Sequence, residues 1–160
     1  MSLPPLPDAA VALGADAADW RAAVAVVGAG LVATGAAKPE YTASMVRMIE
    51  EHGPYVVIAP GLALAHARPG PDVLADGFAV ASLAEPVNFG HPHNDPVRVV
   101  LGLAVTANDR HIGFVAQLAN TFNDSDAVER IAEATSSDEV RSILGVPAVA
   151  AHRAAGEELS

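Results

Sequence analysis

Four short apolar segments in the middle of the chain constrain its fold more than any other feature. They read YVVIA, LALA, GFAVASL and VRVVLGLAVTA, at residues 55–59, 62–65, 77–83 and 97–107, and turn residues separate them. Strands that face water on one side alternate apolar and polar residues, whereas these runs are almost continuously apolar. The pattern therefore predicts a sheet that is covered on both faces.

Helical spacing on either side of these segments supplies the covering layers. Two helices are predicted before them and three after them, with start signals at Asp16 or Asp19, at Pro39, at Asn108 or Asp109, at Asn123 or Asp124, and at the capping-box motif Ser136–Glu139. Glycines at positions 35, 53 and 145 are the expected ends of three of them. We predict an α/β fold with a mixed, mostly parallel sheet sandwiched between helices.

The chain has 160 residues, which is the size of a single domain. The first fifteen residues are rich in Pro and Ala without a clear period, and we expect them to form an N-terminal arm. The domain itself is expected at 16–146, followed by a C-terminal tail at 147–160. We find no internal repeat.

Composition excludes several classes of function. A formal net charge of −10 argues against nucleic acid as a partner, because that binding depends on Lys and Arg neutralising phosphates. The apolar runs are too short to span a membrane. The chain begins without a secretory leader and contains no cysteine, so we expect a cytoplasmic protein. The Ala- and Val-rich faces are compatible with a core or with a homodimer interface.

One glycine motif invites a dinucleotide-binding interpretation. Residues 28–33 read GAGLVA and fit the loose G-x-G-x-x-G/A pattern. That pattern needs a strand before the glycines and a helix after them, but here helical spacing runs back to Trp20. We therefore expect these glycines to allow close packing or the end of a helix.

The segment GLALAHARPG places His66 at the end of a predicted core strand, next to Arg68 and before a turn. Ligands collect at the carboxyl ends of strands in sheets of this kind. A second histidine, His111, follows the next apolar segment with Arg110 beside it, where a helix begins and free backbone N–H groups attract anions. Two histidines with neighbouring arginines favour phosphoryl chemistry, because a neutral imidazole attacks phosphorus without a separate base.

The motif FGHPHNDP raises the alternative of a metal site. His91 and His93 together with His66 and His111 would supply a zinc-binding set for a metal-dependent hydrolase. Against this, the segment is a Pro-rich turn and the chain has no helical H-x-x-x-H motif, so we favour exposed loop histidines over a metal site. We expect no metal and no cofactor.

The combination of GPYVVIAPGLALAHARPG, PVNFGHPHNDPVRVVLGLA and NDRHIGFVAQLANTF resembles the IIA components of the bacterial phosphotransferase system. The similarity covers about residues 20–145 and is greatest to the ascorbate-type branch of the mannitol/fructose superfamily. It implies a mannitol-type enzyme IIA fold that carries a phosphoryl group from HPr to enzyme IIB, with the membrane component IIC acting downstream. It also implies that His66 is phosphorylated and that His111 is the second active-site histidine.

Two positions depart from the family pattern. The arginine that mannitol-type relatives carry in the second helix falls here on Glu50, and Arg47 is close but not aligned. We assign phosphoryl binding to Arg68 and Arg110 instead. Residue 65 is alanine where many relatives have proline. A regulatory domain switched by histidine phosphorylation stays open as an alternative to transport of ascorbate or a related sugar.

Overall fold

The computed structural model describes residues 3–123 and 126–148, except for the side chains of Asn108, Arg110 and His111. Within this part the elements follow the order η1 (Asp8–Ala10), β1 (Val11–Ala15), α1 (Trp20–Ala33), α2 (Glu40–His52), β2 (Val57–Ala59), β3 (Leu62–His66), β4 (Gly77–Val87), β5 (Val97–Ala104), α3 (Asn108–Thr121), α4 (Ala127–Ala132) and α5 (Ser137–Leu144).

The described strands form one sheet in the order β1-β4-β5-β3-β2. β1 pairs with β4 and β3 pairs with β5 in parallel, whereas β2–β3 and β4–β5 are antiparallel. The expected mixed sheet between helices is confirmed. The expectation of a mostly parallel sheet is wrong, since two strand pairs are parallel and two are antiparallel. The antiparallel pairs arise because β2 and β3, and likewise β4 and β5, are consecutive strands that pair directly.

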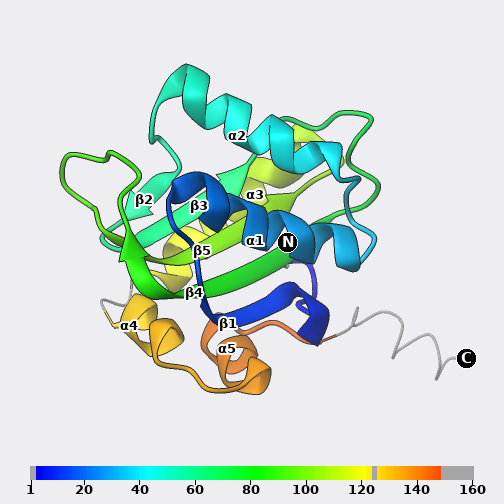
Figure 1. Cartoon of the computed structure of the whole chain (residues 1–160). Helices are drawn as coiled ribbons and strands as arrows, with labels where there is room; N and C mark the ends of the chain where they lie inside the picture. The colour runs from blue at the N-terminus through cyan, green and yellow to red at the C-terminus, as the bar shows by residue number, and fades with distance from the viewer. Residues whose placement is uncertain (1–2, 124–125, 149–160) are drawn as a thin grey trace, which may run out of the picture.

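Helices cover the sheet from both sides (Figure 1). α1 and α2 lie on one face, and α4 and α5 lie on the other. The predicted signals mark helix ends: Asp19 caps α1 by accepting a hydrogen bond from the N–H of Ala22, Gly53 follows α2, and Gly145 ends α5 in a left-handed conformation. Strands β3 and β5 are almost entirely buried, and β4 is buried throughout the apolar run 77–83, as their continuous apolar character predicts.

The glycine motif lies inside α1, so the strand that a dinucleotide site needs is not present there. A Cβ placed on Gly28 would lie 2.0 Å from Oγ1 of Thr42 in α2, and one on Gly30 would lie 3.2 Å from the Cβ of Ala79 in β4. Both glycines allow close approach to a neighbouring element. The packing explanation of this motif is therefore confirmed.

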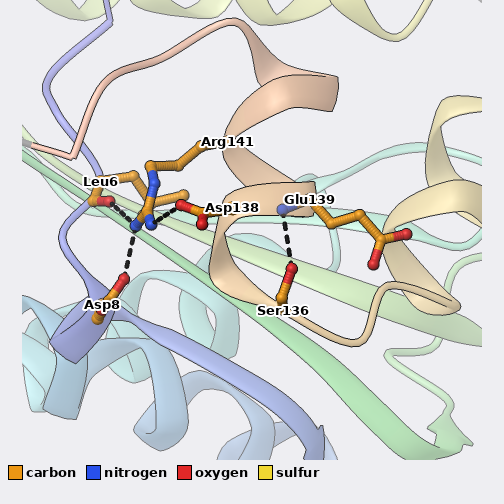
Figure 2. Close-up of polar contacts among 6 residues, drawn as sticks. All are labelled: Leu6, Asp8, Ser136, Asp138, Glu139 and Arg141. Carbon is orange, nitrogen blue, oxygen red and sulfur yellow. Dashed lines mark hydrogen bonds and ion pairs between the residues drawn. The ribbon is translucent and has the colours of Figure 1, made fainter.

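The N-terminal segment differs from our expectation of an arm up to residue 15. Leu6 is fully buried, β1 is an edge strand of the sheet, and the N–H of Leu6 donates to the carbonyl of Pro147. Arg141 of α5 holds the same segment, because its guanidinium donates to the carbonyl of Leu6 at 3.0 Å and to Asp8 at 2.8 Å (Figure 2). The sequence signal failed because small Ala and Val residues carry little periodicity at a sheet edge.

The same helix shows the predicted capping box. The Ser136 hydroxyl accepts from the N–H of Glu139, as Figure 2 shows, and the Glu139 carboxylate reaches back to the N–H of Thr135. Most of the predicted C-terminal tail lies outside the described residues. No helix in the described ranges is long and apolar enough to cross a bilayer.

The contact between α1 and α2 gives a test of the packing. Gly28→Ala should destabilise the fold by about 1–2 kcal/mol, because overpacking costs about 1–3 kcal/mol and exceeds the gain of up to about 1 kcal/mol in helix propensity. Denaturant unfolding measures this cost. In a Thr42→Ala background the clashing hydroxyl and methyl are gone and only the Cβ of residue 42, at 3.0 Å, stays close, so the cost should fall. A stabilised Gly28→Ala single variant would contradict the close contact.

Candidate functional site

The parallel pairing of β3 with β5 brings the carboxyl ends of these strands together, and the predicted site residues lie there. His66 is the last residue of β3 and lies in register with Leu103 of β5. β5 ends at Ala104, and α3 begins at Asn108 a few residues later. His66 and the first turn of α3 therefore lie at the carboxyl ends of two neighbouring parallel strands, where such sheets bind ligands.

The imidazole of His66 is half-buried, and one of its nitrogens is engaged by the backbone. Nδ1 lies 2.9 Å from the carbonyl oxygen of Leu64. A carbonyl oxygen can only accept a hydrogen bond, so Nδ1 must carry the proton. In the neutral ring the lone pair then belongs to Nε2.

The ring of Tyr55 packs against His66 from the segment before β2. The two ring centroids are 5.5 Å apart and the planes are nearly perpendicular, at 89°. Tyr55 is 39% exposed, and burial raises the pKa of its phenol while the nearby Arg68 charge opposes that increase. The phenol therefore stays neutral at neutral pH.

Tyr41, on α2, fixes the backbone directly after His66. Its buried hydroxyl donates to the carbonyl of Leu103 at 2.7 Å and accepts from the N–H of Ala67 at 3.0 Å. Burial, with a smaller contribution from the Asp72 charge, raises the pKa of Tyr41 to about 12, although the Ala67 hydrogen bond opposes the shift. A single hydroxyl thus joins the ends of β3 and β5.

Asp76 organises the connection from β5 to α3. Its carboxylate accepts hydrogen bonds from both the N–H and the hydroxyl of Thr106, at 2.9 and 3.0 Å. The backbone places Arg110 and His111 in the first turn of α3, as the sequence predicts. Their side chains lie outside the described part of the structure.

A groove of about 450 Å³ runs beside the site between α2 and the segment after β3. Two arginines, Arg47 and Arg68, line it, and the other lining residues are Ser44, Met48, Glu51, His52 and Ala67. Guanidinium groups are the side chains best suited to hold phosphoryl oxygens. Glu50, which stands where the resemblance leads us to expect an arginine, accepts hydrogen bonds from Arg21 of α1 at 2.9 and 3.1 Å.

Among the described side chains of the expected metal set, His91 and His93 do not come together with His66. His93 and Asn94 line a pocket with Gly61, which precedes His66 by five residues, or about 16 Å along an extended strand. The ring of His91 accepts hydrogen bonds from the N–H groups of His93 and Asn94, which is a role within the loop. The structure therefore places His91 and His93 near the opposite end of β3 from His66, so these histidines do not form the single metal site that the hydrolase alternative requires.

Comparison with known proteins agrees with this geometry. The family described as "Phosphoenolpyruvate-dependent sugar phosphotransferase system, EIIA 2" matches residues 5–145. The chain belongs to this family. It is a phosphocarrier, the EIIA component of a phosphotransferase system, and the resemblance of its three sequence blocks is confirmed.

Individual relatives of this EIIA component cover most of its length. The "Ascorbate-specific PTS system EIIA component" of Shigella boydii is 36% identical over 135 residues, which is 84% of this chain and 88% of the relative. The Escherichia coli complex of enzyme IIA and phosphorylated enzyme IIB for mannitol contains a similar structure, with a TM-score of 0.79, 30% identity, and coverage of 89% and 99%. The crystal structure of Escherichia coli IIA mannitol gives a TM-score of 0.76 at 31% identity, with coverage of 85% and 96%.

Sequence reasoning missed three residues that shape the site of this EIIA component: Tyr41, Tyr55 and Asp76. The helical spacing of Tyr41 with Met45, Met48 and Ile49 predicts only that it lies on the apolar face of the second helix, and nothing in the sequence points to its hydroxyl. The sequence did carry a signal for Tyr55, because a tight turn at Pro60–Gly61 folds residues 55–59 back along the segment that ends at His66. Asp76 precedes β4 in a turn, where an acidic residue is too common to be distinctive.

The hydroxyl of Tyr41 gives a test of how the strand ends are held. Tyr41→Phe should lower the free energy of unfolding by about 1–3 kcal/mol, because the buried N–H of Ala67 and carbonyl of Leu103 lose their partner. Tyr55→Phe is the matched control at the half-exposed second tyrosine, and it should change stability by less than about 0.5 kcal/mol. Equal unfolding midpoints for the parent and Tyr41→Phe would contradict this role.

The pKa of Tyr41 adds a pH signature to the same variant. The folded chain keeps this proton up to about pH 12, whereas an ordinary tyrosine, as in the unfolded chain, releases it near pH 10.0. The contribution of Tyr41 to the free energy of unfolding is therefore fully present below pH 10 and is lost as the pH rises toward about 12. Tyr41→Phe should remove this part of the alkaline loss.

Proposed function

We propose that His66 accepts a phosphoryl group from phospho-HPr and passes it to an enzyme IIB component. The hydrogen bond between Nδ1 of His66 and the carbonyl of Leu64 carries this proposal. It fixes the proton on Nδ1, so that Nε2 holds the lone pair needed for attack on phosphorus. The position of His66 at the carboxyl end of β3 gives a protein donor an edge of the sheet to approach.

The transfer needs no general base. The Nε2 lone pair forms a bond to phosphorus, the bond from phosphorus to the donor's imidazole nitrogen breaks, and that electron pair returns to the donor ring. The proton on Nδ1 of His66 stays in place, and the Leu64 carbonyl stabilises the positive charge that the ring acquires. Reversal of the same steps passes the group to the next carrier.

The charge on the transferred group requires cations beside Nε2. Arg68 follows His66 by two residues and lines the groove together with Arg47, so both guanidinium groups are in a position to approach the phosphoryl oxygens. Arg110 and His111 belong to the first turn of α3, where backbone N–H groups add a favourable field. We assign His111 the role of stabilising the group during transfer.

Similarity to the ascorbate-specific relatives supports L-ascorbate or a related sugar as the cargo of the system. The solved complex of mannitol IIA with phosphorylated IIB supports an enzyme IIB as the recipient. In this proposal the membrane component IIC receives the phosphoryl group only through IIB. The chain itself acts in the cytoplasm, as members of the family typically do.

Replacement of His66 tests the acceptor directly. The parent, incubated with phosphoenolpyruvate, enzyme I and HPr, should gain one acid-labile phosphoryl group by intact-protein mass spectrometry. His66→Ala should gain none, because the attacking nitrogen is gone. His111→Ala should still accept the group, more slowly.

His93→Ala is the matched control, since His93 lies near the opposite end of β3 from His66. It should be phosphorylated at the parent's rate. A folded parent that gains no phosphoryl group, or a His66→Ala variant that gains one as readily as the parent, would contradict the assignment.

The arginines of the groove make a second test. Arg68→Ala and Arg47→Ala should each slow the acceptance of phosphoryl groups, by on the order of tenfold, because each removes a cation from the developing charge. Single-turnover rates from phospho-HPr measure this effect. Arg98→Ala, near the opposite end of β3, should leave the rate within about twofold. Parent-like rates in both groove variants would show that the cation comes from elsewhere.

A further inference from the structure

Tyr55 combines a large aromatic ring, substantial exposure and direct contact with the reactive imidazole. Its exposed fraction of 39% means that burial in the core does not account for its position. The 5.5 Å separation of centroids and the angle of 89° describe an edge-to-face pair, the arrangement that aromatic rings prefer. Such a contact restricts the orientation of both rings.

The backbone around Tyr55 is held on both sides. The N–H of Tyr55 donates to the carbonyl of Gly53, and the N–H of Val57 donates to the carbonyl of Pro54. The next residue, Val56, accepts a hydrogen bond from the N–H of Leu64 at 2.8 Å. The same residue, Leu64, thus provides the carbonyl that binds Nδ1 of His66 and anchors the segment that carries Tyr55.

These contacts act on different parts of the His66 side chain. The hydrogen bond to Leu64 favours one position of Nδ1, and the Tyr55 ring limits rotation of the imidazole about its last side-chain torsion. A rotation of 180° would exchange Nδ1 with a carbon and Nε2 with the other carbon. It would break the bond to Leu64 and turn the lone pair of Nε2 away from its present direction.

We infer that Tyr55 is a positioning residue that holds the His66 ring with Nε2 aimed at the incoming phosphoryl group. The inference rests on the proposed function of His66 and adds a residue to it. The aromatic ring performs this role, and the neutral hydroxyl is dispensable. Tyr55→Phe therefore keeps the positioning, whereas Tyr55→Leu loses it.

The first measurement reads the tautomer of the unphosphorylated protein. Nitrogen-15 NMR of the His66 ring in the full chain should show the proton on Nδ1 in the parent and in Tyr55→Phe. In Tyr55→Leu the Nδ1–H form should lose population to the Nε2–H form, because the ring is no longer restricted. An unchanged tautomer ratio in Tyr55→Leu overturns the inference.

The second measurement separates positioning from partner docking. Phosphoramidate is a small phosphoryl donor that needs no protein interface; Nε2 bonds to phosphorus as the bond from phosphorus to nitrogen breaks and ammonia leaves. The rate at His66 should fall by on the order of tenfold in Tyr55→Leu and stay within about twofold in Tyr55→Phe. A parent-like rate in Tyr55→Leu overturns the inference.

Two controls complete the design. Ile58→Ala removes another apolar side chain of the same segment with a similar exposed fraction, 40%, and should keep the parent's rate and tautomer. His66→Ala is made in each background. Its phosphorylation by phosphoramidate measures the reaction at the other histidines, and this rate is subtracted from the total. Failure of the parent to accept from phospho-HPr would count against the proposed function alone, because the tautomer and phosphoramidate results do not involve HPr.

Discussion

The parallel pairing of β3 with β5 is the constraint on which the site depends. Because His66 pairs with Leu103, the carboxyl ends of β3 and β5 lie side by side. The chain that follows β5 forms α3. Histidines that are 45 positions apart in the sequence, His66 and His111, are thereby assigned to one edge. A slip of one residue would also turn the His66 side chain to the other face of the sheet.

Two side chains from outside the strands hold the end of β5, Tyr41 against the end of β3 and Asp76 against the start of β4. Tyr41 joins the Ala67 N–H to the Leu103 carbonyl, and Asp76 binds the N–H and hydroxyl of Thr106. Both contacts lie within a few residues of the strand ends. The Tyr41 hydrogen bonds are buried, so a displacement that left their N–H or carbonyl groups unpaired would be costly, and they select one arrangement of the ends of β3 and β5. The reactive ring is thus positioned by backbone that is itself fixed.

The sequence predicted most of the fold because apolar runs and glycine stops report directly on burial and helix ends. Helices begin after Asp19 and Ser136, because their side chains cap backbone N–H groups. One helix ends before Gly53, because glycine readily adopts the positive φ found there. The edge strand β1 escaped prediction, since its small residues carry no distinct period. Of the site, the strand-end position of His66 was predictable, whereas Tyr55 and Tyr41 act through contacts that only the folded register creates.

The periodicity of α2 explains why Arg47 lines the groove and Glu50 does not. The residues of α2 that line the groove are Ser44, Arg47, Met48, Glu51 and His52, which follow the 3–4 spacing of a single helical stripe. Glu50 lies outside that stripe and pairs with Arg21 of α1. An arginine at position 50 would meet Arg21 instead of a carboxylate, so the charge that pairs α1 with α2 would become repulsive. The two arginines that line the groove are therefore Arg47, on the stripe of α2, and Arg68, two residues after the end of β3.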